Sequence, residues 1–258
     1  VLYDISKKVN MNIYLFSHFC LDEEEFPDLI LYEHFINHYL NLGIKSKHFH
    51  IIPCGTGTHH ANAASFKKIN KQYKIKNIRL VKKQHDLKKC FEAYNKWRAT
   101  INRQHWIVKV DLDEFNTYGE FESVYDCANW LQDNNYTAVR GEMMDCISQD
   151  NILNPVQPLE NIFLQFPKQA KITLHLLNQN HYKVLLTKPY IELIWGHHNT
   201  LHETQDVHPK TFETDFLTFH FKWTDKLLKR CKQNLRTEDH ELYSGFQNQI
   251  IKTKKIIK

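Results

Sequence analysis

The chain has 258 residues, of which 42% are hydrophobic and 13% aromatic, a composition typical of a globular protein and unlike that of a disordered one. No apolar run approaches the roughly 18–20 residues of a membrane span, and the N-terminus lacks the charged-then-apolar pattern of a signal peptide. The six cysteines are scattered without a Cys-x-x-Cys pair, which favours free thiols in a reducing, cytoplasmic setting.

The formal net charge is +5, and much of the lysine excess lies between Lys67 and Lys89. Such a region is typical of a solvated face, or of a surface that attracts anionic lipid, nucleic acid or a phosphorylated substrate.

The first 140 residues alternate between strand patterns and helix patterns. Strand patterns lie at 12–16, 49–52, 77–81, 106–110 and 136–139, and helical apolar spacing lies at 22–42, 87–101 and 121–131. Pro27 in the first turn and Gly43 just past the end mark the bounds of the first helix. This alternation predicts an α/β fold with a mostly parallel central sheet flanked by helices.

After residue 140 the pattern changes to short strand candidates with few helical signals between them. These candidates span 162–166, 171–177, 182–186, 191–195 and 216–223. Thr224 is a suitable cap for a following helix that carries Leu227 and Leu235. No linker separates this β-rich part from the first half, so one compact domain is expected.

The stretch 106–115 holds the strongest candidate for chemistry. Its apolar residues predict a buried strand, and Asp111 and Asp113 end that strand with Glu114 beside them. If strand geometry continues, both aspartates point to one face about 7 Å apart. Ligands bind at the carboxyl ends of strands in open α/β sheets, and Asp oxygens suit a hard divalent cation whose shell a phosphate completes. An ordinary solvated strand end is the alternative.

The strand pattern 216–223 offers a second pair of polar residues. Period-two alternation places His220 and Lys222 together on its less apolar face. An imidazole can ligate a metal, and a lysine can neutralise a phosphate. A hydrogen-bonded histidine at a sheet surface is the alternative.

Residues 140–145, which follow a strand pattern, offer further carboxylates. Gly141 permits a tight turn or the close approach of backbone to a ligand. Glu142 and Asp145 are available as a general base. A polar surface turn is the alternative.

His197 and His198 follow Gly196, and His202 lies four residues further on. A zinc site is disfavoured because there is no His-Glu-x-x-His motif and no cysteine nearby. A substrate-contacting pair, or a buried pair with satisfied hydrogen bonds, is the preferred interpretation.

In this order, the segments resemble glycosyltransferases of the GT-A fold, in particular the family-2-like and family-92-like group. The likeness covers about residues 12–236 and includes Phe-Ile-x-His-Tyr-Leu-x-Leu-Gly-Ile at 35–44 and Trp-Ile-x-x-x-Asp-x-Asp-Glu-Phe at 106–115. Gly-x-x-x-Asp at 141–145, the stretch from Lys183 to His198, and His-Phe-Lys-Trp at 220–223 complete it.

The resemblance implies a GT-A fold and an enzyme that moves a sugar from a nucleotide diphosphate sugar to a glycan or glycolipid hydroxyl. A UDP-sugar donor and inversion at the reacting carbon are the expected details. The metal, Mn²⁺ or Mg²⁺, is expected on Asp113, Asp111 and His220. The implied donor contacts are Asp111, Lys222, Gly141 and His198. The implied general base is Asp145 first and Glu142 second, with Glu192 and Glu203 as further alternatives.

One domain is expected over residues 1–258, with a nucleotide-binding half at about 12–140, an acceptor-side half at about 141–236 and a basic helical tail at 237–258. The tail predicts peripheral contact with an anionic membrane, and no nucleic-acid partner is expected. One alternative is a sugar nucleotidyltransferase, which also uses paired acids and a divalent ion but normally carries a Gly-rich N-terminal signature that this chain lacks. A second is a basic nucleic-acid-binding protein, which the lysine-rich region and the many aromatic residues favour. A third is a degenerate, non-catalytic sugar-binding domain.

Overall fold

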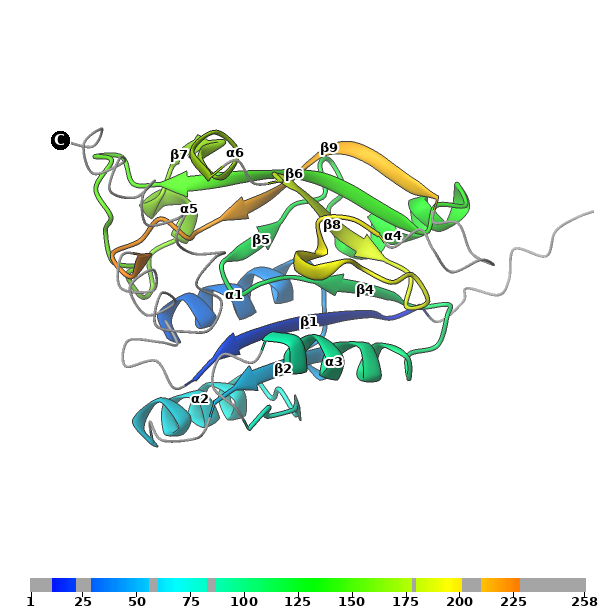
Figure 1. Ribbon diagram of the computed structural model, residues 1–258, viewed down its shortest axis with the longest axis horizontal. Helices are drawn as coiled ribbons and strands as arrows, with labels where there is room; N and C mark the ends of the chain where they lie inside the picture. Colours follow the sequence, from blue (N-terminus) through cyan, green and yellow to red (C-terminus); the bar gives the residue numbers. More distant parts are fainter. Residues whose placement is uncertain are drawn as a thin grey trace, which may run out of the picture.

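The computed structural model describes residues 11–21, 29–55, 60–82, 87–177, 180–200 and 210–227. Nine strands form one sheet with helices on both faces (Figure 1). The strands are β1 (Ile13–Cys20), β2 (Phe49–Cys54), β3 (Asn77–Ile78), β4 (Trp106–Lys109), β5 (Glu114–Asn116), β6 (Ala138–Ile147), β7 (Lys168–Ala170), β8 (Tyr182–Thr187) and β9 (Thr211–His220). The helices are α1 (Leu29–Asn41), η1 (Ser46–His48), α2 (His60–Gln72), α3 (Leu87–Arg98), α4 (Val124–Asp133), α5 (Ile162–Gln165), α6 (Ile172–Leu177) and η2 (Trp195–His197).

The sheet has the order β3-β2-β1-β4-β8-β6-β9-β5, and β7 pairs with β6 beside this path. The strands β3, β2, β1 and β4 are parallel to one another, and β6 is parallel to β9. Antiparallel pairs join β4 to β8, β8 to β6, β5 to β9 and β7 to β6. The predicted α/β class, with a central sheet between helices, is therefore confirmed.

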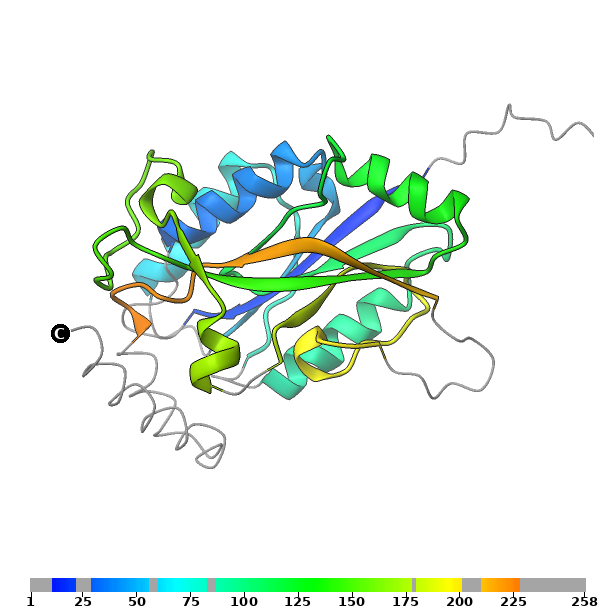
Figure 2. The same cartoon turned by 90° about the horizontal axis from the view of Figure 1, so that it is seen from above.

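Two hydrophobic clusters cover the two faces of the sheet. Figure 2 shows α1 and α4 along one face and α3 with α6 along the other. Strand β4 contributes side chains to both clusters, because its residues alternate between the two faces. Trp106 and Val108 pack in the cluster on the α1 face (the α1 cluster), and Ile107 packs in the cluster on the α3 face (the α3 cluster). Lys109, the next residue on the α3 face, is buried where the apolar alternation predicts a core position. The last residue of β4, Lys109, thus places a charge on the α3 face at the carboxyl end of the strand.

Most of the expected elements in the first half are confirmed. Strands β1, β2, β3 and β4 correspond to the strands expected at 12–16, 49–52, 77–81 and 106–110. Helices α1, α3 and α4 correspond to the helices expected at 22–42, 87–101 and 121–131. Gly43 follows α1 with φ +93°, and its N–H donates to Leu40 O, which is a common way for a helix to end. Helix α2 was not expected, because its sequence is largely polar.

Several expectations for the second half are wrong. The segments 162–166 and 171–177 form the short helices α5 and α6 instead of strands, and 191–195 contributes only the bridge of Leu193 with Thr200. Short apolar runs do not distinguish a strand from a helix. Here, side-chain caps at the starts of the two segments favour the helix. Asn161 Oδ1 accepts the Phe163 N–H at the start of α5, and Asp145 accepts the Thr173 N–H at the start of α6.

Strands β6 and β9 also differ from expectation in their bounds. Strand β6 runs through residues 140–145, so Gly141 lies inside a strand and not in a turn. A Cβ at Gly141 would lie 2.2 Å from Phe216 O of β9, so the strand requires glycine where these two backbones approach. Strand β9 ends at His220, and Lys222 lies beyond its last residue.

None of the helices in the described part of the chain combines the length and the apolar character that crossing a membrane requires. The expected tail 237–258, the helix expected beyond 227, Pro27, His202 and Glu203 lie outside the described residues.

Candidate functional site

The candidate site lies at the point where the strand order of the parallel part reverses. The chain passes from β1 outward to β2 and β3, and then returns to place β4 on the other side of β1. In an open α/β sheet this switch point leaves a crevice at the carboxyl ends of the two central strands. His18 near the end of β1 and Lys109 at the end of β4 lie here, followed by Asp111 and Asp113. We call this edge, with the side chains that meet at it, the rim.

Asp111 is the most accessible carboxylate that the structure describes at the rim. Its side chain is 36% exposed, and its Oδ1 lies 3.6 Å from Lys109 Nζ and 3.7 Å from His18 Nδ1. Burial and the neighbouring Lys109 lower the pKa of His18 to about 3, so His18 is neutral and accepts a hydrogen bond from Lys109 Nζ at 3.0 Å. Among the described residues, Asp111 Oδ1 is buried without a hydrogen-bond partner. A buried carboxylate oxygen in this state is a suitable cation ligand.

Glu114 is enclosed beneath Asp111. Lys183 Nζ lies 2.7 Å from its Oε1, and His197 Nε2 lies 2.9 Å from its Oε2, which also accepts the Asp111 N–H at 3.0 Å. Burial opposes ionisation of Glu114, but Lys183 and His197 outweigh it and hold its pKa well below the usual range. Gly196, with φ +77°, turns the backbone just before His197. The expectation of a buried, hydrogen-bonded histidine is confirmed for His197.

A second chain of contacts runs from Asp113 through His220 to Asp145. Asp113 Oδ2 lies 3.7 Å from His220 Nε2, and His220 Nδ1 donates to Asp145 Oδ1 at 2.8 Å. Asp145 is fully buried and also accepts hydrogen bonds from Thr173 Oγ1 at 2.8 Å and Trp223 Nε1 at 2.9 Å. Burial opposes the charged imidazolium, but Asp113 and Asp145 outweigh it and raise the pKa of His220 to about 9. Asp145 therefore fixes the ring so that Nε2 faces Asp113.

The structure does not bring the three predicted metal ligands into one group. Asp113 contacts His220, whereas Asp111 lies with Glu114 and His197. The ligand atoms of these last three residues lie within 4.8 Å of one another, so they form a partly buried group of two carboxylates and an imidazole that could hold a metal ion. The expectation that both aspartates share one strand face is wrong, because β4 ends at Lys109 and the chain turns at residues 112–113.

The other predicted site residues lie around this rim or away from it. His198 is half-buried, and its Nδ1 is 2.7 Å from Tyr182 O. Glu142 is half-buried and lies 2.7 Å from Lys171 Nζ. The side chain of Lys222 is half-buried just past β9, and Gly141 packs against β9 as described above. Their roles in donor binding or base catalysis stay predictions, as do those of Asp111, Asp113, Asp145 and His220.

Sequence reasoning gave no role to the two buried lysines of the rim. Lys109 and Lys183 lie in the apolar strands β4 and β8, with only 2% and 5% of their surface exposed. A lysine inside an otherwise apolar strand is the signal that could have identified them, since lysine is almost never fully buried unless it is paired. Glu192, the further alternative base, is paired with Arg98 at 3.0 Å and lies outside these contacts.

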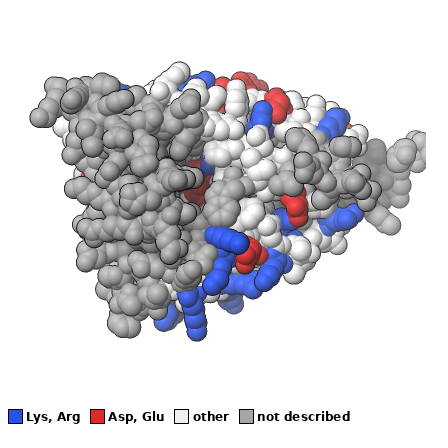
Figure 3. All heavy atoms as spheres, viewed as in Figure 1, with Lys and Arg blue, Asp and Glu red and all other residues white. Residues whose placement is uncertain are grey.

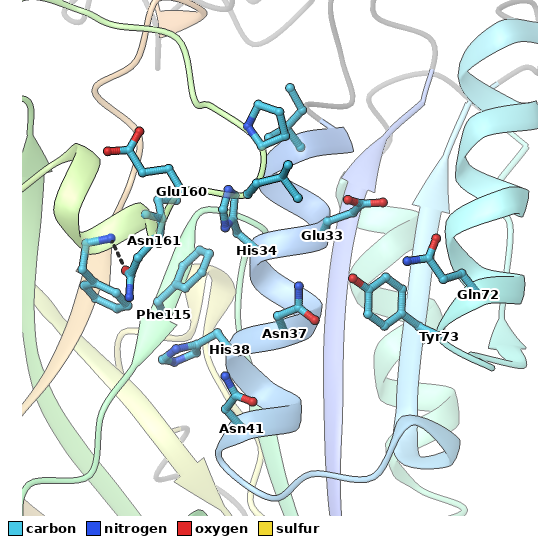
Figure 4. Close-up of a pocket in the computed structure, with 15 residues that line it drawn as sticks. Glu33, His34, Asn37, His38, Asn41, Gln72, Tyr73, Phe115, Glu160 and Asn161 are labelled. Carbon is cyan, nitrogen blue, oxygen red and sulfur yellow. Dashed lines mark hydrogen bonds between the residues drawn. The ribbon is translucent and has the colours of Figure 1, made fainter.

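A cavity of about 500 Å³ lies on the α1 face of the sheet (Figure 4), and none of the rim side chains named above lines it. Its wall includes Glu33 and Asn37 of α1 and Tyr73 beyond α2, and Phe115 lies beside it (Figure 4). Phe115 belongs to the α1 cluster, whereas its neighbour Glu114 faces the rim. We take the rim as the candidate site, because the charged groups with strongly shifted pKa values gather there.

The chain resembles two solved structures at low sequence identity. It is similar to a crystal structure of S. aureus TarS with a TM-score of 0.43 and 8% identity, covering 88% of this chain and 40% of that one. A crystal structure of S. aureus TarS 1–349 gives a TM-score of 0.41 and 10% identity, with 93% and 71% covered. The chain thus spans about two fifths of the length of the first of these structures. No family model and no curated protein matches the chain.

Proposed function

We propose that the protein is a metal-dependent glycosyltransferase of GT-A type, which transfers a sugar from a nucleoside diphosphate sugar to a carbohydrate or glycolipid hydroxyl. The observation that carries the proposal is the chain of contacts from Asp113 through His220 to Asp145 at the switch point of the sheet. Histidines that ligate metals almost always donate their other ring N–H to a carboxylate, a carbonyl or water. Asp145 occupies that supporting position, which leaves His220 Nε2 for a cation shared with Asp113.

Asp111 supports the same function from the other side of the turn. It reaches solvent and has one oxygen without a hydrogen-bond partner among the described residues. It would contact the cation through water or hold a ribose hydroxyl of the donor. Bound Mn²⁺ or Mg²⁺ supplies positive charge that stabilises the departing diphosphate by several kcal/mol. The charge of Glu114, by contrast, is already neutralised by Lys183. We therefore assign Glu114 a supporting role at the rim and not that of a direct metal ligand.

The residues of this chain have separate roles in the proposed reaction. Asp145 is a positioning residue, because it is fully enclosed by its donors. Glu142 is half-buried, so a hydroxyl in solvent has access to it, and it takes the role of candidate base for the acceptor. Lys222 would contribute a point charge to a phosphate. UDP as the nucleotide and inversion at the sugar carbon belong to the same proposal.

The test is release of nucleoside diphosphate from a panel of nucleotide sugars, with Mn²⁺ and with EDTA. Asp113→Asn is expected to lower kcat/KM more than about a hundredfold, because it removes the negative charge that would hold the cation. Asp145→Asn is expected to weaken Mn²⁺ binding by about 10–100-fold, measured by titration of the metal alone. The matched control is Asp133→Asn, an exposed aspartate on α4, which is expected to change neither quantity. Full activity in EDTA, or unchanged turnover in Asp113→Asn, would refute the proposal.

The same preparation distinguishes the nearest alternative enzyme. A sugar nucleotidyltransferase releases pyrophosphate from a nucleoside triphosphate and a sugar 1-phosphate, and a glycosyltransferase does not. Metal-dependent pyrophosphate release without nucleotide-sugar turnover would replace the proposed activity with that one.

A further inference from the structure

The charge of this chain is divided very unevenly. Residues 60–100 hold 12 Lys and Arg against 2 Asp and Glu, a net charge of +10, whereas the whole chain has +5. The remaining residues therefore sum to −5. A protein with this asymmetry is drawn to an anionic surface in one orientation.

The fold gathers these cations along one edge of the sheet. Strand β3 is the edge strand, with α2 against one face of the neighbouring strands and α3 against the other. Ten Lys and Arg side chains of the described part of 60–100 are exposed, and Glu92 is the one exposed acid among them. Figure 3 shows Lys and Arg concentrated over the lower part of the molecule, where Figure 1 has α3 and α2. We call this surface the basic edge.

The helices present these charges outward. On α2, Lys67, Lys68 and Lys71 form the stripe opposite the buried residues Phe66 and Ile69. On α3, Lys88 and Lys96 are exposed, while Cys90 and Tyr94 pack in the core. The cations of α2 and α3, which cover opposite faces of the sheet, and those of residues 76–82 therefore flank the edge strand β3 on both sides.

Two aliphatic side chains are exposed among these cations. Ile78 is 38% exposed and Leu80 is 45% exposed, and Lys76 and Lys82 flank them at two-residue spacing. Apolar side chains on an edge strand are a liability in solution, and natural proteins normally cover or charge such edges. Cations around exposed aliphatic groups are typical of surfaces that lie on anionic lipid, where the aliphatic groups enter the interface.

The same region lacks the side chains that single-stranded nucleic acid prefers. Base stacking requires exposed aromatic rings. In the described part of 60–100, Phe66 and Tyr94 are buried, and Tyr73, Phe91 and Trp97 are half-buried. The chemistry of the basic edge therefore favours lipid over nucleic acid.

We propose that the basic edge docks the protein on an anionic lipid membrane, with Ile78 and Leu80 in contact with the interface. Each Lys or Arg near such a surface strengthens binding about fivefold, and the attraction weakens beyond a Debye length of about 10 Å. Docking through the edge strand keeps the membrane two strands away from the rim, which lies between β1 and β4. This surface is independent of the glycosyltransferase proposal.

The test is co-sedimentation of the full chain with vesicles of phosphatidylcholine that contain about 30% phosphatidylserine, in about 0.1 M salt. The triple variant Lys68→Gln, Lys71→Gln, Lys88→Gln is expected to bind roughly a hundredfold more weakly. The matched control replaces three cations on other parts of the chain, Arg103, Lys168 and Lys210, by Gln and changes the net charge equally. The control is expected to keep most of the binding, because these cations lie outside the basic edge.

A second variant separates insertion from charge. Ile78→Ser with Leu80→Ser is expected to release the fraction that remains bound in about 0.5 M salt, where screening suppresses the ionic part. Both sets of substitutions are at exposed positions, so circular dichroism and the melting temperature are expected to be unchanged.

Several results would overturn the proposal. They are absence of wild-type binding to the anionic vesicles, equal losses in the two triple variants, and loss only when the lysines of residues 252–258 are neutralised. Tight binding of a single-stranded oligonucleotide without vesicle binding would assign the basic edge to nucleic acid instead.

Discussion

The buried ion pair of Lys183 and Glu114 gives a stability measurement that tests how the rim is built. The ammonium lies 2.7 Å from Glu114 Oε1, and the two side chains are 7% and 2% exposed. Lys183→Met keeps most of the apolar stem and removes the charge. Removing one partner of a buried pair costs about 3–5 kcal/mol, because the other charge is left buried. Glu114 would keep its hydrogen bonds with His197 and the Asp111 N–H, so we expect the lower end, about 3 kcal/mol.

The assay is urea unfolding followed by tryptophan fluorescence, with the free energy of unfolding compared at equal m-values. Lys171→Met is the matched control, since its ammonium lies 2.7 Å from Glu142 but the two side chains are 33% and 27% exposed. More exposed pairs contribute about 0–1 kcal/mol, so the control is expected to lose less than about 1 kcal/mol. The double variant Lys183→Met, Glu114→Gln is expected to lose about 2 kcal/mol less free energy of unfolding than the two single variants lose in sum. A loss below about 1 kcal/mol in Lys183→Met would refute the buried pair.

Three further substitutions test other parts of the fold. His50 is 7% exposed, and burial lowers its pKa to about 4, so the unfolded chain binds a proton first as the pH falls from 6.5 to 4. His50→Leu is therefore expected to lose about 2 kcal/mol less stability than the wild type between pH 8 and pH 5, measured by urea unfolding at each pH. Gly141→Ala is expected to cost about 3 kcal/mol, because its Cβ would meet the Phe216 carbonyl oxygen at 2.2 Å, and a melting temperature equal to wild type would contradict this. Ser123→Ala removes the hydroxyl that caps α4 by accepting the Asp126 N–H, and is expected to cost about 1 kcal/mol in the same measurement.

Local patterns predicted the parallel part of the sheet well, because each signal there lies within a few neighbouring residues. The apolar run before Asp111 predicts β4 and the position of the rim at its end. The helical spacing of 87–101 predicts α3, and a strand directly after it predicts the return of the chain to the sheet. Periodicity was sufficient because these elements bury one face each against a common sheet.

The partners at the rim could not be predicted in this way. Glu114 meets Lys183 and His197, which are 69 and 83 residues away in sequence, through strands whose order no local pattern specifies. Asp145 was predicted as a base, but its carboxylate caps α6 and holds His220, and both contacts depend on tertiary packing. The same packing turns residues 171–177 into a helix, although their composition alone fits a strand.

The charges of the rim bear on whether a cation belongs there. In the described part of the chain, the carboxylates that make these rim contacts are Asp111, Asp113, Glu114 and Asp145, and the cations that pair with them are Lys109, Lys183 and protonated His220. Within this set, four negative groups face three positive ones, and one of the three is an imidazolium held by its neighbours. If His220 Nε2 exchanged its proton for a divalent ion, the two remaining lysines and that ion would balance the four carboxylates. Burying unbalanced charge is costly, so a divalent ion at Asp113 and His220 would stabilise the fold as well as the proposed leaving group. Mn²⁺ is accordingly expected to raise the melting temperature of the wild type in the absence of any nucleotide, and an unchanged melting temperature would contradict this reasoning.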